Sequence, residues 1–119
     1  MTRAQFDLAD VTLVNESARE DAPGDVIVFR TPADACAYLE PWWVEDEEGF
    51  VLSGAGQRIL LGHHSGQVVV RMRLDAPEGD ELVSAWLKAA AAYVQRVRHD
   101  EGPASDAVPH LIEYVGFQD

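Results

Sequence analysis

The sequence predicts a single α+β domain in which an antiparallel sheet of about four to six strands packs against one long helix. Between residues 42 and 74, apolar and polar residues alternate with period two and glycine-containing turns separate the runs, which is typical of an antiparallel meander. Residues 81–99 carry apolar side chains at spacings of three and four, as an amphipathic helix does. The 119 residues, 47% of them hydrophobic, suit one core, so we expect one domain over residues 1–119.

Residues 1–25 have the least defined pattern. The apolar residues between Phe6 and Val14 can form one strand, and Pro23-Gly24 marks a turn. Residues 26–30 then predict a short strand, since they are β-branched or aromatic and lie between turn residues.

A short helix is predicted over about residues 32–40. Thr31 is a good N-cap, and Pro32 suits the first helical turn. Pro41 excludes Glu40 from helical geometry, so the helix should end there. We expect Trp42, Trp43 and Val44 to form an extended segment, in which one tryptophan enters the core and the other is exposed.

The last strand of the meander has the pattern of a half-buried strand. One face carries Val68, Val70, Met72 and Leu74, and the other carries Val69, Arg71 and Arg73.

The long helix is predicted over about residues 81–99. Its apolar face comprises Leu82, Trp86, Ala89, Ala90, Tyr93 and Val97. Asp80 is the expected N-cap, and Gly102-Pro103 ends the element. The segment from Ala107 to Phe117 is apolar enough to dock on the core, either as a strand or as a short helix.

The net charge constrains the partners of this protein. Twenty-one acidic against nine basic residues give a formal charge of -12. Nucleic acids and anionic membranes have the same sign and no basic patch is visible, so neither is expected to bind. A basic protein is the natural partner, although the charge could serve solubility alone.

The acidic residues are grouped in two stretches that lack lysine and arginine. The first contains Glu45, Asp46, Glu47 and Glu48, and the second contains Glu78, Asp80 and Glu81. If both stretches lie at the same end of the sheet, their field would accelerate association with a basic partner. An exposed Trp42 or Trp43 would add an apolar anchor. The alternative is two unrelated solvated loops.

No catalytic, cofactor or metal site is predicted. Ser53-Gly54-Ala55-Gly56 lacks the third glycine and following helix of a phosphate loop, so a hairpin turn is expected. His63 and His64 are adjacent, and in a strand they would point to opposite faces. No spacing typical of zinc ligands occurs, which leaves a zinc site built through tertiary contacts as an alternative.

Cysteine usage and the N-terminus suggest a cytoplasmic protein. The single cysteine, Cys36, cannot form an internal disulfide, and it lies on the expected buried face of the first helix, where a catalytic thiolate is disfavoured. No signal-peptide pattern or apolar run long enough to span a bilayer occurs.

The run Val26 to Val44 consists of a strand, a short helix ending in Leu39-Glu40-Pro41, and the aromatic pair Trp42-Trp43. This run resembles a segment of small bacterial proteins, some of which are similar to the immunity proteins of polymorphic toxin and interbacterial competition systems. The likeness covers residues 26 to 62. It implies a small acidic cytoplasmic protein that caps the active site of a cognate toxin, and basic nuclease or deaminase toxins fit the charge found here.

We therefore expect a non-enzymatic binding protein, an immunity protein against a cationic toxin. The oligomeric state is not predicted. The alternatives are a regulatory or adaptor domain that binds a host protein, a nucleic-acid mimic, and a small metal-dependent enzyme that uses His63 or His64.

Overall fold

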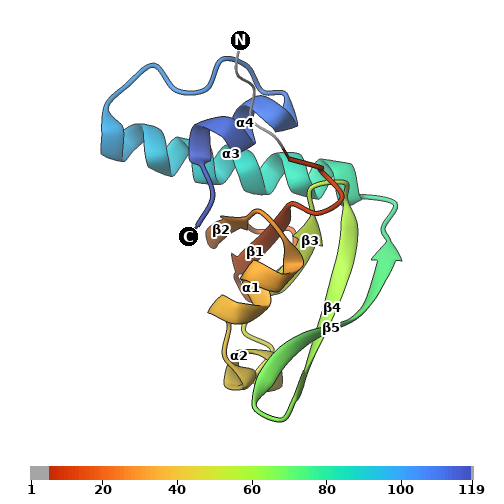
Figure 1. The fold of residues 1–119 in the computed structure, drawn as a ribbon. Helices are drawn as coiled ribbons and strands as arrows, with labels where there is room; N and C mark the ends of the chain where they lie inside the picture. The colour runs from red at the N-terminus through yellow and green to blue at the C-terminus, as the bar shows by residue number, and fades with distance from the viewer. Residues whose placement is uncertain (1–5, 119) are drawn as a thin grey trace.

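The computed structural model describes residues 6–118 and contains a five-stranded antiparallel sheet with the order β2-β1-β3-β4-β5 (Figure 1). The strands are β1 (Thr12–Glu16), β2 (Asp25–Phe29), β3 (Phe50–Ser53), β4 (Gln57–His64) and β5 (Gln67–Asp75). The helices are α1 (Pro32–Tyr38), α2 (Pro41–Glu45), α3 (Gly79–Arg98) and α4 (Val108–Val115). The predicted α+β class, with an antiparallel sheet beside one long helix, is confirmed. The predicted N-terminal segment before Phe6 lies outside the described residues.

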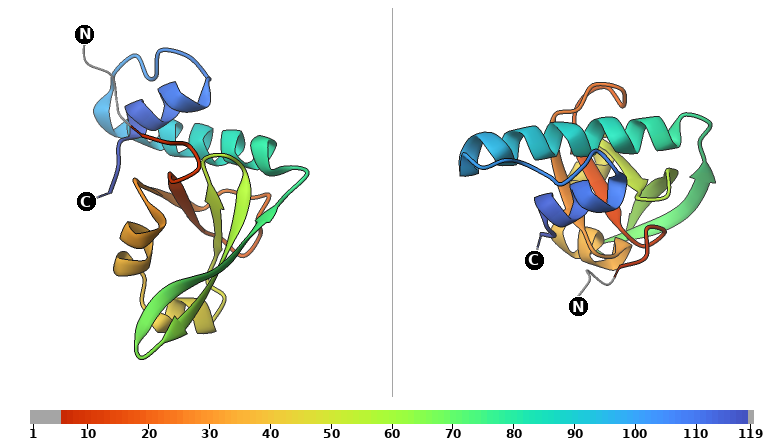
Figure 2. Two further views of the ribbon diagram at one scale, coloured as in Figure 1. Left: turned by 45° about the vertical axis from the view of Figure 1, so that its right-hand side comes forward. Right: turned by 90° about the horizontal axis from the view of Figure 1, so that it is seen from above.

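Helices cover both faces of the β1–β3 part of the sheet, so neighbouring residues of these strands enter two different cores. Leu13 packs in a cluster with Trp86 of α3 and Leu111 of α4, whereas Val14 packs with Ala35 of α1 and Trp43 of α2. The view from above in Figure 2 shows α3 and α1 on opposite sides of the strands. Burial on both faces explains why β1 is apolar without strict alternation.

The predicted extended segment at Trp42 to Val44 is wrong, because Pro41–Glu45 forms the short helix α2. Glu40 has the extended conformation expected before a proline, with φ -106° and ψ 155°. A proline also fits the first turn of a new helix, so Pro41 both ends one helical segment and begins the next. The meander consequently starts at Phe50 rather than at residue 42.

The half-buried alternation predicted for the last strand holds only at Val68. Val70, Met72 and Leu74 are all exposed. The register of β4 and β5 shifts between Leu60 and Leu61, which is a β-bulge that interrupts the alternation. In Figure 1, α2 lies beside the turn end of this hairpin, and Val68 packs in one cluster with residues of α1 and α2.

Helix α3 begins two residues before the predicted start, and its N-cap is Glu78 rather than Asp80. The backbone of Gly79 lies against Gly56, where a Cβ atom would come within 1.9 Å of the Gly56 carbonyl oxygen. This close contact fixes the first turn of α3 on the β3–β4 turn. The expected apolar face is confirmed at Leu82 and Trp86, but Tyr93 is 63% exposed because α3 extends past the sheet.

The C-terminal segment forms helix α4, which resolves the choice between strand and helix. Leu111 and Ile112 of α4 are buried against α3 and the sheet. After α4, the Gln118 amide donates to the Val28 carbonyl at 2.7 Å, so the C-terminal segment covers part of the β2 edge.

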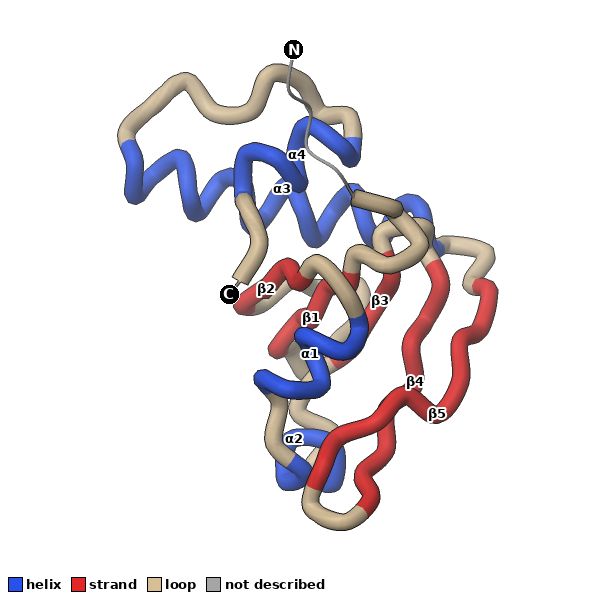
Figure 3. Tube along the Cα trace, in the orientation of Figure 1, coloured by secondary structure: helices blue, strands red, loops and turns tan. Residues whose placement is uncertain are grey.

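The sheet is nearly divided between β3 and β4. Four residue pairs join β1 to β3 and eight join β4 to β5, but only Leu52 and Arg58 pair between β3 and β4. Beyond this pair, β4 and β5 continue past the end of the short strand β3, as Figure 3 shows. The β4–β5 hairpin therefore diverges from the rest of the sheet, and this divergence positions the candidate site.

We predict that Ser65→Asn stabilises the protein. Ser65 and Gly66 connect β4 to β5 with φ of 52° and 78°, the pattern of a type I′ turn, in which Asn-Gly is favoured. Asparagine tolerates positive φ better than serine, so the melting temperature should rise by an amount equivalent to about 0.5 kcal/mol. Ser65→Val is the control and should lower it. A higher melting temperature for the valine variant would contradict this turn geometry.

Candidate functional site

The first acidic stretch forms an exposed surface at the end of α2. Glu45 is the last residue of the helix, and Asp46, Glu47 and Glu48 form the turn that leads into β3. All four side chains are exposed. Glu45 accepts a contact from His63 at 3.0 Å, whereas no ionic partner of the other three carboxylates occurs within residues 6–118. Three neighbouring carboxylates are thus free to meet a cation.

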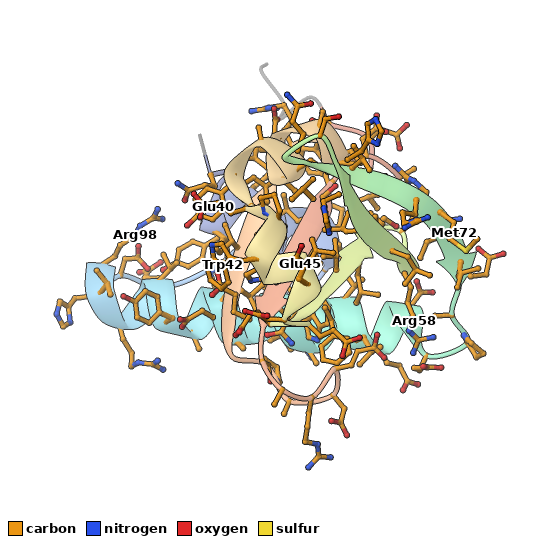
Figure 4. All side chains as sticks on the ribbon, turned by 90° about the horizontal axis from the view of Figure 1, so that it is seen from below. Glu40, Trp42, Glu45, Arg58, Met72 and Arg98 are labelled. Atoms are coloured by element: carbon orange, nitrogen blue, oxygen red, sulfur yellow. The ribbon has the colours of Figure 1, made fainter. Side chains whose placement is uncertain are left out.

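The second acidic stretch lies elsewhere, so the two stretches do not form the single patch considered above. Glu78 bonds Arg58 at the start of β4, whereas Glu45 contacts His63 near the end of the same strand. Figure 4 shows Arg58 beside the N-terminal part of α3, away from Glu45 on α2. Asp80 and Glu81 are exposed on the first turn of α3, where the helix dipole favours negative charge.

Arg58 joins three segments that are distant in the sequence. Its Nε and Nη2 atoms donate to the two carboxylate oxygens of Glu20 at 2.8 and 2.6 Å, and Nη2 also contacts Glu78. The main chain of Glu20 is fixed in turn, because its carbonyl accepts a hydrogen bond from Trp86 Nε1 at 2.8 Å. Bidentate contacts of this kind hold a guanidinium group in one orientation.

The Arg58 cluster shifts the protonation equilibria of its members. The hydrogen bonds that Arg58 donates to Glu20, and then to Glu78, raise the pKa of Arg58. The hydrogen bond from Arg58 lowers the pKa of Glu78 below its ordinary value of 4.5. Both residues therefore remain charged near neutral pH.

The two tryptophans of α2 have different environments. Trp42 is 51% exposed, and its indole nitrogen donates to Glu40 at 2.6 Å. Trp43 is only 6% exposed and packs between α2 and the sheet. One tryptophan is in the core and one is exposed, as predicted, although the segment is helical rather than extended. Trp42 is the tryptophan available as an anchor.

A groove of about 430 Å³ opens where β3 and β4 diverge. We call it the β3–β4 groove, and it is lined by Glu20 of the β1–β2 connection, Trp43 and Glu47 of α2 and its following turn, Phe50 of β3, and Arg58 and Leu60 of β4. It connects the region of the Arg58 cluster with the acidic turn after α2. Sequence analysis missed this feature because the divergence of two paired strands leaves no local pattern.

Trp43, which lines the groove, carries a buried polar group without a partner among the described residues. Trp43 Nε1 is buried and has no hydrogen-bond acceptor among residues 6–118. Asn15 Nδ2 is likewise unpaired within the same range, and both residues lie against Gly49. Such donors are rare in folded proteins, because each costs about 1–3 kcal/mol when water is lost and no acceptor replaces it.

The histidines and the cysteine are not gathered into a metal site within residues 6–118. His63 contacts Glu45, and no group of three or more His, Cys, Asp or Glu residues in the described part of the chain could hold a metal ion. Burial raises the pKa of the Cys36 thiol, which disfavours the reactive thiolate. The turn at Ser53 to Gly56 connects β3 to β4, as expected for a hairpin.

Comparison with protein-family models, with curated proteins and with solved structures finds no match to this chain. Within residues 6–118, no helix has both the length and the apolar character needed to cross a membrane.

Sequence analysis also missed Glu20 and Arg58. They are separated by 38 residues, and contacts over such distances leave no periodic signal. One available signal was the position of Arg58, which is the first basic residue after the stretch from Thr31 to Gln57.

We predict that Arg58→Met destabilises the fold. The substitution keeps much of the alkyl stem but leaves the half-buried Glu20 carboxylate without its partner, so unfolding should require about 1–2 kcal/mol less free energy. Arg71→Met is the matched control, since Arg71 is exposed on β5 and forms no salt bridge with described residues. Denaturant unfolding measures both. Equal effects of the two substitutions would show that the salt bridge between Arg58 and Glu20 does not stabilise the fold.

The same pair of variants gives a prediction about pH. Because the folded-state pKa of Glu78 is depressed, its contribution to stability is present above pH 4.5 and is lost as the pH falls through the folded-state value. In Arg58→Met, the pKa of Glu78 should rise toward its ordinary value, because only the smaller effect of its backbone hydrogen bond remains, and Arg71→Met should leave the pKa unchanged. Carbon-13 NMR of the side-chain carboxyl follows the titration. An equal pKa of Glu78 in Arg58→Met and in the wild type would refute the assigned cause.

Proposed function

We propose that this chain is a cytoplasmic, non-enzymatic immunity protein that binds a basic bacterial toxin and covers its active site. The observation that carries the proposal is the exposed run Glu45–Glu48, in which three carboxylates have no ionic partner among residues 6–118. The run begins at the last residue of α2, a helix that packs on the sheet through the buried Trp43. Carboxylates held on a rigid element keep their arrangement during encounter, which favours rapid electrostatic association.

Other observations support a basic protein as the partner. The chain has a net charge of -12, and the exposed Trp42 lies in the same helix as Glu45. An aromatic side chain beside a charged surface is typical of binding hot spots. Nuclease and deaminase toxins bind polyanionic substrates, so an acidic surface can occupy the path that their substrates use.

Growth rescue tests the proposed function. Expression of a toxin encoded beside this gene should arrest growth, and co-expression of this chain should restore it. Purified toxin and this chain should also form a complex in calorimetry. Absence of both rescue and binding would overturn the proposal.

Charge reversal tests the acidic run itself. Asp46→Lys with Glu48→Lys should slow association with the toxin about tenfold at low salt and weaken its salt dependence, because steering is lost. The control is Glu101→Lys with Asp106→Lys, which makes the same charge change in the connection between α3 and α4. Stopped-flow mixing gives the rates. Equal slowing by both double variants would assign the effect to net charge rather than to this surface.

A further inference from the structure

We propose that the β3–β4 groove binds one lysine or arginine side chain of the partner protein. This inference rests on the proposed function and deepens it, because it identifies where a cationic side chain of the toxin would insert. The groove is separate from the outer surface of the acidic run, and only Glu47 belongs to both.

The walls of the groove suit the methylene stem of a long cationic side chain. Phe50 and Leu60 line it from β3 and β4, and Leu60 is 41% exposed although it is a large apolar residue. Lysine and arginine bury their stems along apolar surface while the charged end stays near polar groups. A cavity of about 430 Å³ accommodates such a side chain together with water.

The charges around the groove favour a cation over an anion or a neutral group. Glu20 and Glu47 line it, and Glu78 contacts the same arginine that Glu20 holds. These three carboxylates are opposed by the single guanidinium of Arg58. Arg58 is occupied by its own two partners, whereas the Glu47 carboxylate has no ionic partner among residues 6–118. We therefore place the charged end of the inserted side chain at Glu47.

The indole of Trp43 is a probe for occupation of the groove. Trp43 lines the groove, and this residue is only 6% exposed. Its Nε1 atom has no hydrogen-bond acceptor within the described residues. A cationic side chain that inserts beside the indole changes the environment of its NH. The Trp43 indole NH signal therefore reports whether the groove is occupied.

Glu47 allows a test that separates binding from stability. Its φ of 50° lies in the left-handed region, where glycine is favoured over glutamate. Glu47→Gly therefore removes the carboxylate and relieves the backbone at the same time, so the variant should melt at the same temperature as the wild type or higher. Loss of binding in this variant could not be attributed to unfolding.

The experiment uses the whole chain and NMR-detected titration with pentapeptides of the form acetyl-Gly-Ser-X-Ser-Gly-amide. The residue X is lysine, arginine, Nε-acetyllysine or norleucine. The signal followed is the Trp43 indole NH, which is assigned by its disappearance in Trp43→Phe. We expect the lysine and arginine peptides to shift this signal and the acetyllysine and norleucine peptides to leave it unchanged. In Glu47→Gly, binding should weaken about tenfold, as expected for loss of one charge-assisted contact.

Controls separate this inference from the proposed function. Asp46→Lys with Glu48→Lys should lower the affinity for the lysine peptide but leave the Trp43 shift at saturation intact. Equal binding of the norleucine peptide would show that the groove accepts apolar side chains, and absence of any Trp43 shift would show that it is not a binding site. Either result overturns the groove inference. Rescue of growth by co-expression of this chain with the toxin would still support the proposed function.

Discussion

The contact between Arg58 and Glu20 is the interaction on which the arrangement of this protein depends. Arg58 lies in the only residue pair that joins β3 to β4, and its side chain also holds the β1–β2 connection and the start of α3. The two parts of the sheet are thus linked at one end and separate at the other. This geometry leaves a groove beside α2, while the buried cluster around Trp86 holds α3 on the sheet.

Local sequence patterns predicted most of the elements and failed where tertiary packing decides. The helix at residues 79–98 and the β3–β5 meander have strong periodic patterns, and both are present. The Trp42 to Val44 segment is too short for a period to separate helix from strand, and Pro41 is compatible with either. In β5, the bulge opposite Leu60 and Leu61 changes which residues face the core, and the sequence contains no marker of it.

The candidate site was predictable only in part, for a similar physical reason. Exposure of Glu45 to Glu48 follows from their charge, and the sequence alone indicates it. The separation of this run from Glu78 depends on where β4 begins and ends relative to the helices. Glu20 and Arg58 come together through a contact between residues 38 positions apart. Charge composition therefore suggested the kind of partner, whereas the place of binding required the fold.

The Arg58 contact joins β3 and β4 at one end only, and cross-strand backbone NOEs measure the resulting divergence of the two strands most directly. If the sheet divides as described, NOEs connect Leu52 to Arg58, and none connect Phe50 or Val51 to the β4 residues beyond Arg58. A continuous ladder of NOEs from the Leu52–Arg58 pair to Phe50 would show that β3 and β4 pair along their length. It would contradict both the divided sheet and the proposed groove between the two strands.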